Sequence, residues 1–449
     1  MSYAPDAIAA IATAPGRGGI GVVRISGRDL SRVMQGVIGR ELTPRVAVVA
    51  RFLGADGEAL DRGLALWFPA PASYTGENVL ELHGHGGPAV LGLVLARCLE
   101  LGARIAQPGE FTQRAFLNDK FDLAQAESVA DLIDAGSAAA ARAAGRSLSG
   151  EFSRYTHALV AALVELRALT EATLDFPDED IDFLRTANAA QRLAALQGQV
   201  SSLLARSRQG VLLRDGLAVV IVGAPNVGKS SLLNRLAGDD IAIVTDVPGT
   251  TRDAIRSEID VRGVPLHVVD TAGVRESTDA VETIGIARTW EAVARADLAL
   301  VVTDARDTDD AHGALLAGLD PALPRIVVRN KIDLMGAGPR RQSLEGERRE
   351  VWMSARTGVG LDLLQDAVLE VAGASEDMQG AFLARERHVQ AIIVAQRHLD
   401  SATAQLAIPS IELVAEELRA AQDALSSITG AFGSDDLLGE IFGRFCIGK

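Results

Sequence analysis

Four short motifs in a fixed order constrain the fold of this chain more than any other feature. The first reads Gly-Ala-Pro-Asn-Val-Gly-Lys-Ser from Gly223 to Ser230. The others are Asp-Thr-Ala-Gly from Asp270, Asn-Lys-Ile-Asp from Asn330 and Ser-Ala from Ser354, all within about 130 residues. A glycine-rich turn between a strand and a helix gathers main-chain N–H groups around phosphates. The order of the motifs therefore predicts a nucleotide-binding α/β domain.

The residues around the first motif support this prediction. Ala218–Val222 is apolar enough for a buried strand, and Ser230–Leu236 has the pattern of a helix. Gly223 and Gly228 are expected to let the backbone turn, and Lys229 places a positive charge on the β- and γ-phosphates. The Ser230 hydroxyl is a predicted Mg²⁺ ligand. The predicted nucleotide-binding residues of this loop are Asn226, Val227, Gly228, Lys229, Ser230 and Ser231.

The later motifs predict which base is bound. Asp270 ends the apolar run Leu266–Val269, so its carboxylate is expected near Mg²⁺. The Asp333 carboxylate can accept hydrogen bonds from guanine N1–H and the exocyclic amine, whereas adenine offers no matching donor pair. The Ala355 N–H is expected to meet the guanine carbonyl. These motifs predict GTP binding and hydrolysis through Asp270, Thr271, Ala272, Gly273, Asn330, Lys331, Asp333, Ser354, Ala355 and Arg356.

A loop between these motifs is expected to order around the γ-phosphate. Thr251 is the predicted second Mg²⁺ ligand, and an ordinary Pro-Gly turn is the alternative. Val274 stands where many GTPases carry a water-orienting Gln, and valine cannot take that role. The hypothesis is that Glu282 positions the water, the alternative being a solvated acidic residue. The predicted GTP-binding residues of the loop are Thr245, Asp246, Val247, Pro248, Gly249, Thr250 and Thr251.

The pattern changes along the chain predict a multidomain protein. Residues 1–118 mix short β-like runs with glycine-rich turns, as in an α+β domain. Residues 119–215 and 375–449 have helical spacing, and residues 216–374 alternate strands and helices. Neither helical stretch alone offers a broad core. We therefore expect one discontinuous helical domain into which the α/β domain is inserted.

Composition limits the partners and the compartment. The net charge of −15 argues against a general polyanion-binding surface, and aromatic residues make up only 4% of the chain. The basic runs Arg340–Arg341 and Arg385–Arg387 are predicted to be solvated faces, with contact to a nucleic acid as the alternative. Cys98 and Cys446 are the only cysteines, too few for a disulfide framework or a zinc site. Without a signal-like segment or a long apolar run, a cytoplasmic protein that does not enter membranes is expected.

With these motifs read, the chain resembles the family of tRNA-modification GTPases called MnmE or TrmE over essentially its whole length. The resemblance is carried by motifs throughout the sequence. They are Pro15-Gly-Arg-Gly-Gly19, Arg24-Ile-Ser-Gly27, Leu80-Glu-Leu-His-Gly-His-Gly-Gly-Pro88, Pro108-Gly-Glu-Phe-Thr112, Phe116-Leu-Asn-Asp-Lys120, Asp175-Phe-Pro-Asp-Glu179, Gly249-Thr-Thr-Arg-Asp253 and Phe445-Cys-Ile-Gly-Lys449. The terminal Cys-Ile-Gly-Lys is the most family-specific.

The resemblance implies a folate-binding N-terminal domain that dimerises, a helical domain and an inserted GTPase domain. It also implies that the protein works with a flavin-containing (FAD-dependent) partner, in a heterotetramer. The reaction would modify carbon 5 of the wobble uridine of certain tRNAs, with 5-formyl- or 5,10-methylene-tetrahydrofolate as one-carbon donor. The nitrogen source, ammonia or glycine, stays open.

The resemblance further assigns roles to single residues. Glu282 matches the family's water-positioning glutamate. Cys446 could act as a nucleophile near the one-carbon carrier, and packing at a helix end is its alternative. An activating potassium ion would be held by Asn226, Thr245, Val247 and Thr250. The folate site would comprise Arg24, Glu81, Lys120 and Lys449.

Two other functions compete with this interpretation. A ribosome-assembly GTPase usually carries a basic RNA-binding domain, whereas the flanks of this chain are acidic and helical. A self-assembling mechanical GTPase would favour filaments or membranes, and no basic amphipathic helix supports that.

Overall fold

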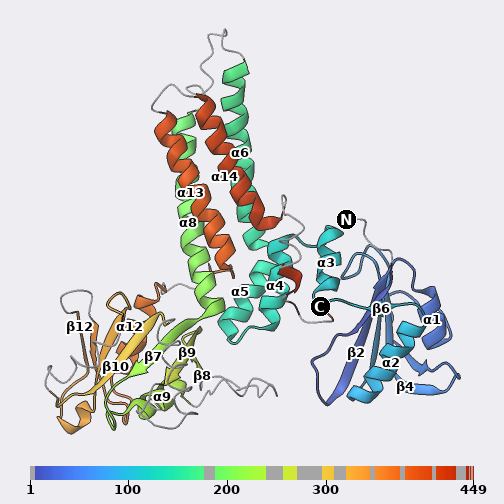
Figure 1. The fold of residues 1–449 in the computed structure, drawn as a ribbon, viewed down its shortest axis with the longest axis horizontal. Coiled ribbons are helices and arrows are strands. Elements are labelled where there is room, and N and C mark those ends of the chain that lie inside the picture. The colour runs from blue at the N-terminus through green and yellow to red at the C-terminus, as the bar shows by residue number, and fades with distance from the viewer. Residues whose placement is uncertain are drawn as a thin grey trace, which may run out of the picture. The chain divides into compact units, whose positions relative to one another are not determined.

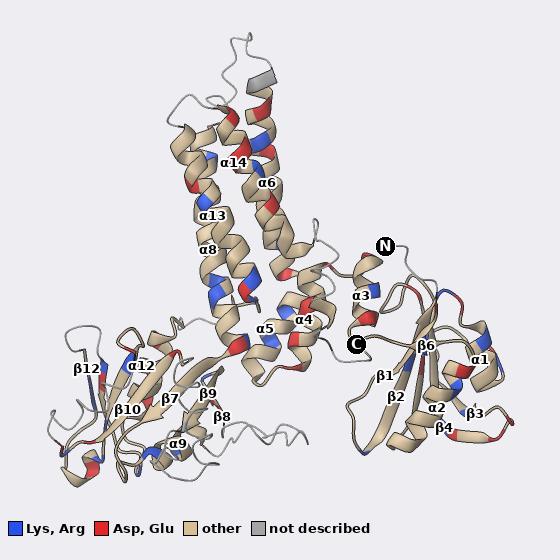
Figure 2. Cartoon of the chain, viewed as in Figure 1, with Lys and Arg blue, Asp and Glu red and all other residues tan. Residues whose placement is uncertain are grey.

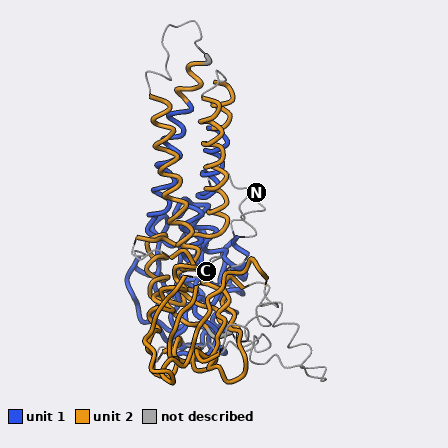
Figure 3. Tube along the Cα trace, turned by 90° about the vertical axis from the view of Figure 1, so that its left-hand side faces the viewer, with its two compact units in different colours: residues 1–130, 148–167, 418–449 blue, residues 131–147, 168–417 orange. Residues whose placement is uncertain are grey.

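The computed structural model describes residues 6–175, 188–238, 256–270, 296–307, 320–343, 349–374, 380–406, 411–430, 441–443, 445 and 448. The chain divides into two compact units (Figure 3). Unit 1 comprises Met1–Ala130, Leu148–Arg167 and Leu418–Lys449, and unit 2 comprises Asp131–Ser147 and Ala168–Glu417. Four of the described helices contribute residues to both units, and they span Leu123–Ile133, Ala138–Leu148, Glu151–Asp175 and Ile411–Thr429. This division therefore leaves the predicted domain boundaries at 118, 215 and 374 as predictions.

Unit 1 contains a six-stranded sheet in the order β3-β4-β5-β2-β1-β6. Helices α1 (Ser31–Ile38) and α2 (Pro88–Glu100) bury their apolar side chains against one face, and α3 (Glu110–Leu117) packs Phe111 against Ile8 and Ala10 of the other. The strands are β1 (Ile8–Ile11), β2 (Gly18–Gly27), β3 (Val48–Leu53), β4 (Ala59–Phe68), β5 (Asn78–Gly86) and β6 (Arg104–Ile105). This arrangement confirms the predicted α+β fold of the N-terminal region.

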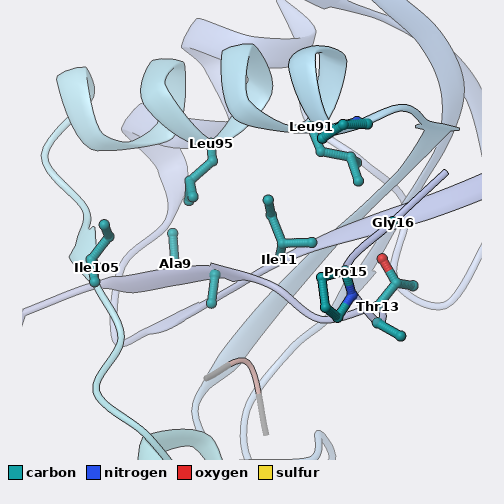
Figure 4. A pocket seen from close by; sticks show the side chains of 11 residues that line it. Ala9, Ile11, Thr13, Pro15, Gly16, Leu91, Leu95 and Ile105 are labelled. Carbon is teal, nitrogen blue, oxygen red and sulfur yellow. The ribbon is translucent and has the colours of Figure 1, made fainter. Parts of the chain in front are cut away.

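A pocket of about 360 Å³ lies between β1, β6 and helix α2 of unit 1 (Figure 4). Its walls include Ile11, Thr13, Pro15, Leu91 and Leu95. The eleven described lining residues carry no charged side chain, and none belongs to the predicted folate site. An anionic ligand would find no ion-pair partner on these walls.

Long helices flank the α/β part of the chain in sequence. They are α4 (Leu123–Ile133), α5 (Ala138–Leu148), α6 (Glu151–Asp175), α8 (Ala189–Asp215), α13 (Glu386–Leu406) and α14 (Ile411–Thr429). Helix α8 precedes the α/β part and α13 follows it, and the two lie side by side (Figure 1). Their contact confirms the predicted discontinuous helical domain. No described helix is long and apolar enough to cross a membrane.

Charged residues of both signs lie along these helices (Figure 2). The prediction of a solvated basic run at 385–387 is wrong for Arg385. Its side chain is only 14% exposed, and it donates a 2.8 Å hydrogen bond to the Asp131 carboxylate. Arg341, in the other predicted run, forms an ion pair with Glu370. Two arginines that the sequence predicted to be solvated are therefore in ion pairs.

The α/β part of unit 2 has a seven-stranded sheet in the order β12-β13-β11-β10-β7-β9-β8. The five central strands are parallel, and β8 and β12 join antiparallel at the edges. The strands are β7 (Leu217–Val222), β8 (Arg256–Val261), β9 (Val264–Asp270), β10 (Leu298–Asp304), β11 (Arg325–Asn330), β12 (Arg340–Ser343) and β13 (Arg349–Trp352). Helices α9 (Lys229–Ala237) and α12 (Leu361–Val371) contribute to the same apolar core.

The parallel strands explain why the motifs meet. The first motif follows β7, Asp270 ends β9, Asn330 ends β11, and Ser354 follows β13. Because the carboxyl ends of parallel strands share one edge of a sheet, residues more than 100 positions apart in sequence come together there. The predicted strands before the motifs and the predicted helix after the first motif are confirmed.

Candidate functional site

The glycines of the loop after β7 are required for two different reasons. Gly228 has φ of +102°, and a Cβ atom there would lie 2.3 Å from the Asn330 Nδ2 atom. Gly223 lies where a Cβ would come within 2.3 Å of the Val302 carbonyl oxygen of β10. Gly223 therefore serves close packing, while Gly228 serves both the turn and the close approach.

Lys229 and Ser230 begin helix α9 directly after this loop. The Lys229 ammonium donates hydrogen bonds to the carbonyl oxygens of Gly223 (2.8 Å) and Ala224 (3.0 Å). Ser230 is exposed in the first turn of the helix. The free N–H groups and the positive dipole end of α9 lie here, next to a lysine and an accessible hydroxyl. This combination suits a phosphate group.

Asn330 connects two parts of the site. Its side chain is buried, and its Nδ2 donates to the Val227 carbonyl at 2.8 Å. Its Oδ1 accepts from the Ala355 N–H, also at 2.8 Å. One side chain at the end of β11 thus joins the loop after β7 to the segment after β13. In this structure the Ala355 N–H predicted for the guanine carbonyl is hydrogen-bonded to Asn330, so a base would have to share or replace that bond.

Lys331 makes a second connection to the same loop. Its Nζ donates to the Asn226 carbonyl at 2.7 Å and forms a 3.0 Å ion pair with Asp304. Hydrogen bonding from Arg306, then from Lys331, outweighs burial and holds the pKa of the Asp304 carboxyl well below its usual range. Sequence reasoning missed Asp304, although its position at the end of a central strand is a signal that could have found it.

Asp333, the predicted guanine reader, is exposed in the short helix Ile332–Leu334. The Ser354 hydroxyl donates to its Oδ1 at 2.7 Å and also accepts from the Thr357 N–H at 3.2 Å. Ser354 therefore orients the carboxylate whose hydrogen bonds would select the base. The base contact itself stays a prediction.

Other predicted residues lie outside the described part of the chain. These are the loop residues Thr245, Asp246, Val247, Pro248, Gly249, Thr250 and Thr251, together with Thr271, Ala272, Gly273, Glu282, Cys446 and Lys449. Asp270 is described by its backbone alone, at the end of β9. Their assigned roles stay predictions.

A second group of predicted residues lies on the sheet of unit 1. Arg24 on β2 pairs in register with Glu81 on β5, and the Arg24 Nε donates to the Glu81 carboxylate at 2.9 Å. The Arg24 guanidinium carbon lies 5.2 Å from the Tyr74 ring centroid and 5.8 Å from that of Phe111. His83 Nε2 lies 3.1 Å from the second Glu81 oxygen. Two predicted ligands thus form one aromatic-flanked ion pair.

Lys120 lies on a neighbouring segment of unit 1. Its Nζ donates to the Pro71 carbonyl at 3.2 Å, in the segment that leads to Tyr74. The Tyr74 hydroxyl is 2.8 Å from the Thr112 hydroxyl of α3. Burial raises the pKa of Tyr74, against the effects of Thr112 and Arg24. Sequence reasoning missed Tyr74, and no spacing pattern marks it.

Behind this pair lies a buried polar network. Arg114 is 2% exposed and donates to the carboxylates of Glu77 (2.8 Å) and Glu110 (2.9 Å). Burial opposes ionisation of Glu110, but hydrogen bonds from Arg104, the Gln107 N–H and Arg114 outweigh it and lower its pKa to about 2. The network fixes α3 to the segment that carries Tyr74. The sequence signal for this network was the motif Pro108–Thr112, which contains Glu110 and was given no role from the sequence alone.

Two family models together match almost the whole chain. A model of the MnmE helical domain matches residues 123–446, and a model of the N-terminus of the GTP-binding protein TrmE matches residues 7–120. The chain is 58% identical over 445 residues to the tRNA modification GTPase MnmE of Thiobacillus denitrificans, covering 99% of this chain and 98% of that protein. It is 59% identical over 447 residues to the protein of the same name from Azoarcus sp., with the same two shares covered.

Solved structures match a part of the chain. The G domain of the FeoB iron transporter of T. maritima is 25% identical, covering 35% of this chain and 98% of that one, with a TM-score of 0.27.

Proposed function

Because this chain belongs to the MnmE/TrmE family of tRNA modification GTPases, we propose that it uses GTP hydrolysis to drive modification of carbon 5 of the wobble uridine of certain tRNAs. It is a GTP hydrolase that acts in tRNA modification. The observation that carries the GTP-binding part of the proposal is the bridge made by Asn330. This side chain joins the phosphate-binding loop to the base-reading segment, so that recognition of the base and of the phosphates belongs to one rigid arrangement.

The phosphate end of the site works through charge and main-chain donors. The N-terminal N–H groups of α9 bind phosphate oxygens, and Lys229 exchanges its two carbonyl partners for the β- and γ-phosphates. The exposed Ser230 hydroxyl fits a Mg²⁺ ion, which Ser230 and Thr251 would hold. A bound Mg²⁺ neutralises charge that develops on the phosphates. Glu282 positions the attacking water in this proposal.

A potassium ion would complete the charge compensation. Asn226, with φ of +66°, is exposed in the loop before α9 and belongs to the proposed ion site with Thr245, Val247 and Thr250. A monovalent cation beside the phosphates supplies the positive charge that an arginine finger supplies elsewhere. Comparison of GTP turnover in K⁺ and in Na⁺ tests this part, and equal rates would contradict it.

The Arg24–Glu81 contact refines the proposed folate site. A cation can suit the glutamate tail of folate, and a carboxylate can suit its amino-pterin edge, but these are opposite ends of the ligand. Two residues in direct contact act on one end. The pair suits the pterin edge, where N–H donors and an acceptor lie side by side, and leaves Lys120 and Lys449 for the anionic tail. Cys446 would then lie near the one-carbon group as a nucleophile.

The partners follow from family membership. We include a second copy of the chain, an FAD-dependent partner protein in a heterotetramer, and tRNA, all in the cytoplasm. A tetrahydrofolate derivative, in the 5-formyl or 5,10-methylene form, is the proposed one-carbon donor.

The test is mass spectrometry of wobble nucleosides from cells with and without this chain. Loss of the modified uridine, with a normal ribosome profile, supports the proposal against the ribosome-assembly alternative. Unchanged nucleosides would contradict it.

A further inference from the structure

The segment Ser354–Thr357 is held by a side chain that comes from the phosphate-binding helix. Arg235, six residues after Lys229 on α9, donates from Nε to the Ala355 carbonyl at 3.2 Å and from Nη2 to the Arg356 carbonyl at 2.7 Å. We propose that Arg235 is a positioning residue for guanine recognition, which holds the Ala355 N–H where it meets the guanine carbonyl. The inference rests on the proposed binding of GTP.

The main-chain groups of this segment account for the need. The Ser354 N–H donates to the Val359 carbonyl at 2.9 Å, and the Ser354 carbonyl accepts from the Gly358 N–H at 2.8 Å. These bonds close the turn and do not involve the next two carbonyls, those of Ala355 and Arg356. Ala355 is only 3% exposed, and a polar main-chain group at such a position needs a partner. Arg235 supplies a donor to each of the two carbonyls.

The guanidinium is the right shape for this task. Its Nε and one Nη lie along one planar edge, so that a single side chain can donate to two successive carbonyls in a fixed geometry. A lysine would provide one point charge on a flexible stem. The turn also passes close to the guanidinium, since a Cβ on Gly358 would lie 3.9 Å from the Arg235 Cζ atom. Gly358 has φ of +84°, which favours glycine there.

Two residues therefore bind the two main-chain polar groups of Ala355, which belong to successive peptide groups. Asn330, at the end of β11, binds its N–H, and Arg235, on α9, binds its carbonyl. When a base competes with Asn330 for the N–H, the bond from Arg235 to the carbonyl keeps the Ala355 main chain in place. Because α9 begins with Lys229, the same helix sets the positions of the phosphate lysine and of the base-reading N–H.

The experiment compares three nucleotides on the full-length protein. GTP and inosine triphosphate carry the 6-carbonyl, and 2-aminopurine riboside triphosphate lacks it. Dissociation constants are measured for the wild type, Arg235→Gln, Arg235→Lys and the control Asn234→Ala, an exposed position on the same turn of α9. We expect Arg235→Gln to raise the dissociation constants of GTP and inosine triphosphate by about 10-fold, equivalent to about 1.4 kcal/mol of binding free energy. Binding of 2-aminopurine riboside triphosphate should stay within about 2-fold, and Arg235→Lys should recover only part of the loss.

The possible outcomes separate the hypotheses. An equal loss for all three nucleotides would mean general damage to the site and would overturn the positioning role. Unchanged GTP binding in Arg235→Gln would overturn it as well. If the wild type itself failed to prefer GTP over ATP, the proposed function would fail, whatever the variants do.

Discussion

The nucleotide site and the Arg24–Glu81 site hold their cations in different ways. Lys229 donates only to main-chain carbonyls among its described contacts. Arg24 instead forms an ion pair with a carboxylate and lies against two aromatic rings. Below it, Arg114 satisfies two buried carboxylates.

This difference indicates what each site can bind. When a lysine exchanges a carbonyl for a phosphate, no unpaired charge is left behind. The whole positive charge of Lys229 is therefore available to an anion in the nucleotide site. If Arg24 left Glu81, the largely buried carboxylate would keep His83 beside it but lose its permanent cation, which is costly. The unit 1 site therefore favours a ligand that offers donors to Glu81 and an acceptor to Arg24 together.

The largest expected effect comes from the loss of Arg114, the buried cation that Glu77 and Glu110 share in unit 1. Arg114→Met leaves Glu77 and Glu110 without their shared cation, and we expect a loss of about 3–5 kcal/mol of local stability. Hydrogen exchange of the β1–β6 sheet measures it. The control is Arg262→Ala, which breaks an exposed ion pair with Asp366 and should cost about 1 kcal/mol or less. Equal protection in both variants would contradict the comparison.

Loss of Lys229 should lower the rate of GTP hydrolysis without lowering the stability of the fold. Lys229→Ala removes charge from the phosphates, and we expect GTP turnover to fall by about 100- to 1,000-fold. Its hydrogen bonds go to carbonyls of a partly exposed loop, so hydrogen exchange of β7 should barely change. Unfolding of the seven-stranded sheet in this variant would show that the lysine is structural.

The Arg24–Glu81 pair should behave as one unit in ligand binding. We expect Arg24→Ala and Glu81→Gln each to weaken 5-formyl-tetrahydrofolate binding by about 10-fold, and the double variant to lose little more than either one. Calorimetry on the full chain measures all three. Losses that multiply in the double variant would mean that the two residues act on separate parts of the ligand.

Acid should weaken unit 1 through Glu110. Its pKa falls from 4.5 to about 2 on folding, so that its contribution to stability is complete above pH 4.5 and is lost as the pH falls toward 2. Hydrogen exchange of α3 between pH 5 and 2 follows the loss, which Glu110→Gln should reduce. An unchanged acid profile in the variant would rule out this group as the cause.

Local patterns predicted the parts of the nucleotide site that depend on local sequence. The strands before Gly223 and Asp270 follow from apolar runs, and both are present. The hydrogen bond from Asn330 to Val227 joins positions 103 residues apart and depends on the order of parallel strands. Sequence spacing does not encode that order.

The same limit applies to unit 1 and to Arg235. The pairing of Arg24 with Glu81 depends on the register of β2 against β5, which no local pattern fixes. The contact of Arg235 with Ala355 joins positions 120 residues apart and depends on where the fold places α9 relative to the segment after β13. The need for Gly223 also differs from the expected one, because neighbouring β10, and not a turn, excludes a side chain there.

The central claim is that one connected site recognises the guanine base and binds the phosphates. Calorimetry with GTP, ATP and xanthosine triphosphate on the wild type and Asp333→Asn tests it most directly. Xanthine carries a carbonyl where guanine has its amine, so that an asparagine amide can donate to it. We predict that the wild type binds GTP at least about 100-fold more tightly than ATP. The Asp333→Asn variant should lose affinity for GTP and gain affinity for xanthosine triphosphate. Equal affinity of the folded wild type for GTP and ATP would contradict the account.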